Sequence, residues 1–324
     1  MFSIGDAHAI KDNLPEMDFS AVANSEPPLV RYLQHYHLDF ALPSAEKTHD
    51  VHHAMGFFMA AGFRIACQYF RPQQAQGSVL IVHGYYDHAG LFAHLISYCL
   101  RRKLAVVIFD LPGHGLSSGE VAAIGEFSQY TEVLRGCLGM MTAQGLPAPF
   151  HVLTQSTGGA IFMDYCLHHC AQSLQEIGDA VLLAPLVHPS AWQRGKWQHA
   201  VMRYFVGSIA RNFTDNSHDE LFLRFLRESD PLQSRRLSVA WVSALKRWLR
   251  EFAACSPCVK PLSIIQGTGD TTVDWQYNLP RIQEKFPASQ QFLIANARHH
   301  LANESAQYRE QLETLLDEIL GRVY

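Results

Sequence analysis

A serine at position 156 has the sequence surroundings that a catalytic nucleophile requires. The apolar run His151-Val152-Leu153 leads into Thr154-Gln155-Ser156-Thr157-Gly158, and an apolar helical run begins near Ala160. A serine on a sharp turn between a strand and a helix is typical of a nucleophile elbow, whose strained backbone lifts the hydroxyl above the sheet. The pattern departs from G-x-S-x-G at its first position, which is Thr154. Taken alone, the stretch fits an ordinary strand–helix loop equally well.

An acid and a histidine follow later strands in the order that such a serine needs. A serine hydroxyl becomes a strong nucleophile only when a base takes its proton and an acid orients that base. Asp270 comes after the apolar run 262–266, and His299 comes after the run 291–294. Alone, Asp270 could be a turn residue and His299 a surface histidine. Their chain order after a serine is the order expected on a parallel sheet, so we predict the triad Ser156, Asp270 and His299, with His300 as the alternative base.

The same chemistry requires N–H donors for the oxyanion that develops on an acyl carbonyl. The main-chain N–H of Thr157, directly after the serine, is one candidate. The second is the N–H of Tyr85, which follows His83-Gly84 at the end of a buried strand. Gly84 allows the backbone to turn there without a side-chain clash.

Alternating strands and helices position these residues. A hairpin is predicted at 57–69, and continuous apolar runs predict buried strands at 78–82, 104–109, 150–153, 180–184, 262–266 and 291–294. Helices are expected between them and at 304–323. This alternation predicts an α/β fold with a mostly parallel sheet and helices on both faces. Ligands of such folds bind at the carboxyl ends of the strands.

The chain divides into three expected parts. The first part, residues 1–50, is expected to comprise an extended or loosely packed arm over 1–28 and a short helix at 30–38. Residues 51–185 and 251–324 are expected to form the core, and 186–250 a helical cap over the site. One helical face of the cap is expected to bind an acyl group, and it carries Trp197, Val201, Tyr204 and Phe205, followed by Ser208 and Ile209.

Composition excludes several classes of protein. Lys and Arg total 26 against 30 Asp and Glu, so no basic excess favours nucleic-acid binding. The chain lacks a signal-peptide pattern and an apolar run long enough to cross a bilayer. Seven scattered cysteines suit a reduced, cytoplasmic protein. Near the cap face, basic Arg194, Lys196 and Arg203 leave open a peripheral contact with an anionic membrane.

Two cysteine pairs invite a metal or redox interpretation. Cys255 and Cys258 form a single C-x-x-C without a second pair, which favours a loop. Cys166 and Cys170 share a helix face, which favours apolar packing. We therefore expect no metal and no organic cofactor.

Three stretches resemble the monoacylglycerol lipase, lysophospholipase and serine-aminopeptidase-like group of α/β-hydrolases. They are His83-Gly84-Tyr85-Tyr86-Asp87-His88-Ala89-Gly90, Phe109-Asp110-Leu111-Pro112-Gly113-His114-Gly115-Leu116-Ser117 and Ala297-Arg298-His299-His300-Leu301-Ala302-Asn303-Glu304. The resemblance covers residue 53 to the C-terminus. It implies the α/β-hydrolase fold, Ser156, Asp270 and His299 as the triad, Tyr85 and Thr157 as oxyanion donors, and a cap at about 186–250.

The sequence thus predicts a serine hydrolase that cleaves a carboxylic ester with an apolar acyl group, through an acyl-enzyme on Ser156. Its partner would be a small ester or lipid, monoacylglycerol-like or lysophospholipid-like. A peptidase or amidase is an alternative, because the same triad serves both reactions. The other alternative is a non-catalytic ligand-binding protein of the same fold, which Thr154 in place of the elbow glycine favours mildly.

Overall fold

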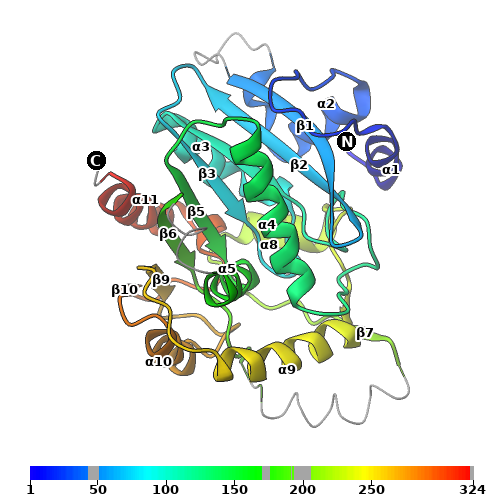
Figure 1. Ribbon diagram of the computed structural model, residues 1–324. Coiled ribbons are helices and arrows are strands. Elements are labelled where there is room, and N and C mark those ends of the chain that lie inside the picture. Colours follow the sequence, from blue (N-terminus) through cyan, green and yellow to red (C-terminus); the bar gives the residue numbers. More distant parts are fainter. Residues whose placement is uncertain (43–50, 170–175, 191, 193–205, 322–324) are drawn as a thin grey trace.

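A mostly parallel sheet forms the centre of the molecule (Figure 1). The computed structural model describes residues 1–42, 51–169, 176–190, 192 and 206–321. Within these residues the main sheet has eight strands, in the order β1-β2-β4-β3-β5-β6-β9-β10. All neighbours from β4 to β10 are parallel, and β2 is antiparallel to both β1 and β4. The strands are β1 (Val51–Ala60), β2 (Phe63–Pro72), β3 (Gly77–Val82), β4 (Leu104–Phe109), β5 (Phe150–Gln155), β6 (Ile177–Leu183), β9 (Ser263–Gly267) and β10 (Gln290–Ile294).

Helices cover both faces of this sheet, which is why its central strands are apolar on both sides. Leu80 and Val82 of β3 join one core and Val79 and Ile81 the other, because successive side chains point to opposite faces. The first core includes residues of α4 (Ser128–Ala143), α5 (Thr157–His168), α9 (Val239–Ala254) and α10 (Trp275–Lys285). The second includes residues of α1 (Ile4–Asn13), α2 (Pro27–His35), α3 (Ala93–Arg101), α8 (Glu220–Glu228) and α11 (Ala306–Leu320).

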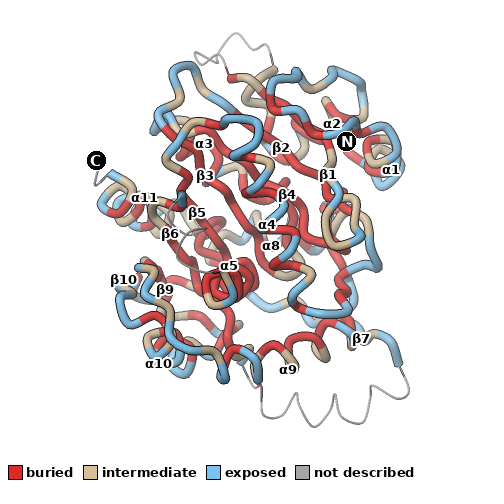
Figure 2. Tube along the Cα trace, viewed as in Figure 1, coloured by how far each residue is buried: buried red, intermediate tan, exposed pale blue. Residues whose placement is uncertain are grey.

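The predicted α/β architecture is confirmed by this arrangement. Figure 2 shows buried residues running along the inner strands and through α5, the helix that follows Ser156. Short 3-10 helices are η1 (Asp39–Ala41), η2 (Ala89–Phe92) and η3 (Leu301–Asn303). In the described part of the chain, no helix is both long enough and apolar enough to cross a membrane.

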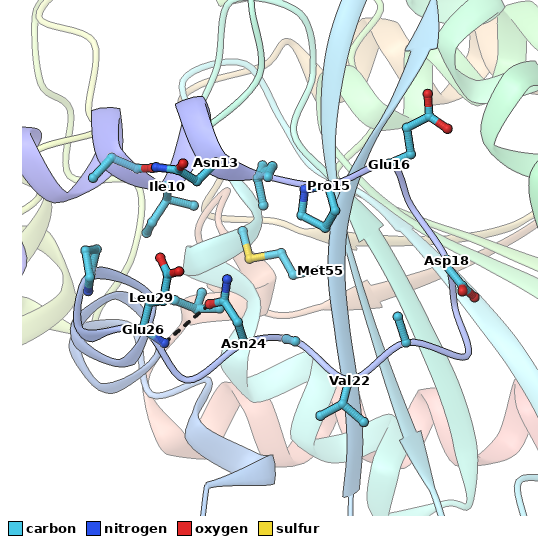
Figure 3. Close-up of a pocket in the computed structure, with 15 residues that line it drawn as sticks. Ile10, Asn13, Pro15, Glu16, Asp18, Val22, Asn24, Glu26, Leu29 and Met55 are labelled. Carbon is cyan, nitrogen blue, oxygen red and sulfur yellow. Dashed lines mark hydrogen bonds between the residues drawn. The ribbon is translucent and has the colours of Figure 1, made fainter.

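The N-terminal residues form a packed layer, whereas the sequence predicted an extended or loose arm up to residue 28. Helix α1 lies inside that range and starts with a capping box between Ser3 and Asp6. The chain after α1 pairs with β1, where the N–H of Met17 donates to the carbonyl of Phe57 over 2.7 Å. A cavity of about 120 Å³ remains beneath this layer, and Figure 3 shows Met55 of β1 in its lining.

The stretch between β6 and β9 departs from the all-helical expectation. Its described part contains α8 and α9 together with a two-stranded sheet, in which β7 (Ser208–Ala210) pairs antiparallel with β8 (Arg236–Ser238). Ser208 and Ile209 therefore lie in a strand and not on a helix. The sequence did not indicate this strand, because three residues carry too little alternation to be recognised. The predicted acyl-binding residues and the neighbouring basic residues lie outside the described residues: Trp197, Val201, Tyr204, Phe205, Arg194, Lys196 and Arg203.

Candidate active site

Ser156 occupies a strained turn between β5 and α5. Its backbone has φ 52° and ψ −111°, a conformation that non-glycine residues rarely adopt. Such strain persists only where the surroundings hold the backbone firmly. Here the N–H of Ser156 donates to the carbonyl of Leu183 over 2.9 Å, and the Ser156 carbonyl accepts from the N–H of Leu186 over 3.0 Å. The strand, sharp turn and helix predicted around the serine are thus present.

Two glycines allow α5 to approach the sheet beside this turn. A Cβ on Gly158 would lie 2.2 Å from the carbonyl oxygen of Val82, so only glycine fits there. A Cβ on Gly159 would lie 2.9 Å from Pro185 Cβ and 3.4 Å from Thr154 Oγ1. Thr154 is itself fully buried, and its side chain lies beside the space that Gly159 leaves open. The turn therefore forms although Thr154 replaces the usual glycine.

His299 and Asp270 meet at the ends of β10 and β9. His299 Nδ1 lies 2.7 Å from Asp270 Oδ2, and both side chains are buried. An ionised carboxylate only accepts hydrogen bonds, so Nδ1 carries the proton and Nε2 is left free to act as a base. Asp270 Oδ1 also accepts from the main-chain N–H groups of Thr272 and Val273 over 2.7 and 3.1 Å, which fixes its orientation.

Burial and charge oppose each other at this pair. For His299, burial disfavours the cation, but the charge of Asp270 and its hydrogen bond outweigh burial and raise the pKa above its ordinary value. For Asp270, burial opposes ionisation, yet the facing imidazole and the hydrogen bonds keep the carboxyl pKa below its usual range. The pair therefore favours a carboxylate beside an imidazole that gains a proton readily.

His300, the alternative base, has a different partner. Its Nε2 lies 3.2 Å from Asp87 Oδ1, while Asp87 Oδ2 accepts from the N–H of Gly84 over 3.2 Å. His299 is further tied to the serine turn, because Gln155 Nε2 donates to the His299 carbonyl over 2.9 Å. The geometry thus favours His299 over His300 as the partner of Asp270.

A single cavity of about 410 Å³ brings together the predicted serine, both candidate bases and the two predicted oxyanion donors, while Asp270 lies behind His299 and outside the lining. Ser156, Thr157, Tyr85, His299 and His300 all line it. Among the described residues, the N–H groups of Tyr85 and Thr157 donate to no other protein group, so both are available to a bound oxygen. Apolar side chains form another part of the lining, namely Leu186, Trp192, Ile209, Leu237, Val239, Trp241, Val242 and Val273.

The side chain of Tyr85 connects the loop after β3 with the stretch between β6 and β9. Its hydroxyl donates to the carbonyl of Ala122 over 2.7 Å and accepts from the N–H of Ser238 over 3.3 Å. Its ring stacks on Trp241 of α9 with centroids 3.9 Å apart and planes 18° apart. The position of its N–H is therefore supported by contacts far away in sequence.

Two groups near the cavity were not anticipated from the sequence. Arg211 lines it from the chain after β7. Close by, His88 Nε2 lies 2.9 Å from Asp230 Oδ2, and Tyr36 donates to Asp230 Oδ1 over 2.7 Å, all in the interior. His88 lies in the first of the three resembling stretches, but nothing in that stretch points to Asp230 or Tyr36, because the two contacts of Asp230 join positions 142 and 194 residues apart.

The family follows from a profile match over most of this fold. The profile of the family described as serine aminopeptidase, S33, matches residues 73–306, more than two thirds of the chain. The chain belongs to this family. The resemblance stated from the three sequence stretches is thereby confirmed.

Curated proteins similar to this S33 family member are lipases and esterases. A monoacylglycerol lipase of Mycolicibacterium smegmatis is 31% identical over 110 residues, which is 34% of this chain and 39% of that protein. A pimeloyl-[acyl-carrier protein] methyl ester esterase of Xylella fastidiosa is 26% identical over 154 residues, 46% of this chain and 51% of that protein. The matches span about two fifths and one half of these relatives.

Solved structures show the fold of this S33 family member in other proteins. A soluble variant of the monoglyceride lipase of Saccharomyces cerevisiae, in complex with a substrate analogue, superposes with a TM-score of 0.69 at 18% identity. The superposition covers 83% of this chain and 94% of the yeast chain. At this identity the likeness establishes the α/β-hydrolase fold.

Proposed function

We propose that this S33 family protein is a serine hydrolase that cleaves a carboxylic ester with an apolar acyl group, of the monoacylglycerol or lysophospholipid kind. The observation that carries the proposal is the strained Ser156 in one cavity with His299, whose Nδ1 is 2.7 Å from Asp270. A strained serine, a base with a free Nε2 and a buried acid are the parts of an acyl-transfer site.

The reaction would begin with transfer of the Ser156 hydroxyl proton to His299 Nε2 as Oγ attacks the ester carbonyl. The N–H groups of Tyr85 and Thr157 would stabilise the oxyanion of the tetrahedral intermediate. Collapse breaks the ester bond, and His299 returns its proton to the departing alcohol. A water molecule, deprotonated by His299, then hydrolyses the acyl-enzyme, which releases the acid and restores Ser156.

The apolar lining indicates where the acyl group would lie. Leu237, Trp241 and Val242 belong to the stretch between β6 and β9, which we propose is a cap over the strand ends. Burial of an alkyl chain against these residues is favourable in proportion to its area. The cap helix face at 197–205 remains a prediction for the rest of an acyl channel.

An aminopeptidase is the second candidate, because the family profile carries that description. An enzyme of that type needs an acidic group to bind the free α-amino group of its substrate. Of the described residues that line the cavity, Asp87 is the only acidic one, and His300 and the N–H of Gly84 already occupy its two oxygens. This arrangement favours an ester over a peptide with a free amino terminus.

Labelling by a fluorophosphonate probe tests the proposal, because the probe reacts only with an activated serine. We expect the wild type to be labelled and Ser156→Ala to be inert. Ser190→Ala, which removes another hydroxyl of the same cavity, should still be labelled. An unlabelled wild-type protein that is folded would favour the non-catalytic alternative.

Esterase kinetics test the individual roles. Ser156→Ala, His299→Ala and Asp270→Asn should each lower turnover by about three orders of magnitude or more, since triad members act as a unit. His300→Ala should lower it far less, because its Nε2 pairs with Asp87. Loss of activity in His300→Ala with activity retained in His299→Ala would show that the base is the neighbouring histidine.

A further inference from the structure

The guanidinium of Arg211 is a cation in the wall of the cavity that contains Ser156, and neighbouring groups hold it in place. Its guanidinium carbon lies 3.9 Å from the ring centroid of Tyr86 and 4.3 Å from that of Phe213. Its Nη1 donates to Gln233 Oε1 over 2.7 Å and to the carbonyl of Ser234 over 3.2 Å. Stacking and hydrogen bonding together restrict a side chain that is otherwise flexible.

Among the described residues, this cation has no carboxylate partner. Within the described residues, no Asp or Glu oxygen lies within 4.0 Å of the guanidinium, and the stretch 193–205 contains neither residue type. The acids whose charges reach it are already paired: Asp87 with His300, and Asp230 with His88. Burying a cation without a counter-ion costs free energy, because the charge loses contact with water. An anionic ligand in the cavity would offset this cost.

The free edge of the guanidinium suits an oxyanion. In the described part of the chain, Nε and Nη2 of Arg211 donate to no protein group. Two N–H groups on one edge of a planar guanidinium match two oxygens of a phosphate or a carboxylate. Burial lowers the pKa of Arg211, but from a value so high that the side chain stays charged.

Neighbouring polar groups extend this part of the cavity. Asn212, Thr214 and Asn216 line it as well, and Asn216 Oδ1 is buried with no hydrogen-bond partner among the described residues. The cavity therefore combines a polar, cationic section with the apolar lining described above. Such a combination fits an amphiphile with an anionic group.

We propose that Arg211 binds an oxyanionic group, phosphate or carboxylate, of the ester substrate and makes the enzyme prefer anionic amphiphiles to neutral monoacylglycerols. The inference rests on the proposed esterase function for its kinetic consequence. Its binding consequence is independent of catalysis. A purely structural role, in which Arg211 only holds the β7–β8 sheet against Tyr86, predicts equal losses for every substrate.

The kinetic test compares esters of one acyl chain: decanoylglycerol, its phosphate, and a decanoyl ester of a hydroxy acid. Arg211→Gln should lower kcat/KM for the two anionic esters about tenfold to a hundredfold, mainly through KM, and leave the neutral ester within about threefold. Arg235→Gln is the matched control. Arg235 lies near the same Phe213 ring but is absent from the lining of the cavity, so its loss should not change the ratio of anionic to neutral rates.

A binding test separates this inference from the proposed function. Octyl phosphate and octanoate are titrated calorimetrically into full-length Ser156→Ala, with and without Arg211→Gln. Binding of either anion that weakens about tenfold or more with Arg211→Gln supports the proposal, and the stronger anion identifies phosphate or carboxylate as the ligand. Affinities that are unchanged by Arg211→Gln, or absent in both variants, overturn it. If the wild type hydrolyses no ester but the anions still bind in a way that depends on Arg211, the proposed esterase function is refuted and the proposed anion site is not.

Discussion

Gly158→Ala tests whether close contact between α5 and β3 positions the candidate site. The added Cβ would lie 2.2 Å from the Val82 carbonyl oxygen and 2.9 Å from that of His83, whereas ordinary contacts begin at 3.4 Å. These oxygens belong to the backbone at the end of a central strand, which has β4 and β5 hydrogen-bonded on either side. Helix α5 must therefore move away by about 1 Å, and Ser156 and the Thr157 N–H must move with it.

The structure allows the size of the effect to be worked out. Overpacking costs about 1–3 kcal/mol, and replacing a helical glycine by alanine returns about 0.5–1 kcal/mol, so the free energy of unfolding should fall by at most about 2.5 kcal/mol. A displacement of about 1 Å at the reacting groups lowers a rate by about a hundredfold. We thus expect a protein that still folds and whose kcat/KM falls about a hundredfold, equivalent to about 2.7 kcal/mol in the activation free energy.

Gly139→Ala on α4 is the matched control. Gly139 is exposed, and a Cβ there would have no atom within 4 Å. This variant should be more stable by about 0.5–1 kcal/mol and fully active. Denaturant unfolding and kcat/KM for a short-chain ester measure both quantities. If Gly158→Ala matches Gly139→Ala in stability and activity, the close approach of α5 does not position the site.

Three further predictions follow from the buried contacts. The midpoint of the acid limb of the kcat/KM pH profile should lie above the ordinary histidine pKa, because His299 must be neutral to act as a base and its pKa is raised. In Asp270→Asn this midpoint should move to lower pH, because the carboxylate that raises the pKa is lost. A midpoint that does not move contradicts the pairing. Thr154→Gly should leave esterase activity within about tenfold, and a larger loss would give this side chain a role in the site. Tyr36→Phe should lower the free energy of unfolding by about 1.5–3 kcal/mol, since Asp230 loses a buried hydrogen bond; an unchanged denaturation midpoint would show that this bond contributes nothing.

The order of the strands and the residues at their ends could be predicted because both depend on local signals. Buried parallel strands are continuous apolar runs, and the residues that follow them meet at one edge of the sheet. This reasoning predicts that Asp270 and His299 meet, and in the structure their side chains are 2.7 Å apart. Their catalytic roles remain a prediction until the variants are measured.

The features that sequence reasoning missed lack such a signal or rest on distant contacts. Helix α1 buries only Ala7 and Ile10, so apolar periodicity does not mark it, although Ser3 and Asp6 form a capping box that is readable from the sequence. The strands β7 and β8 are too short to alternate. Arg211 acquires its surroundings from Tyr86 and Gln233, which only the folded chain brings to it.

The stacking of Tyr85 on Trp241 has a consequence for redesign of the protein's substrate range. Exchange of the whole stretch between β6 and β9 for that of a relative would remove the Ser238 and Trp241 contacts of Tyr85. The chimera would then lose support for the proposed main-chain donor at Tyr85, even where its new cavity suits the new substrate. Grafts that end before Ser238 keep this support. The position of the graft junction therefore decides whether a change of substrate selectivity is accompanied by a loss of rate.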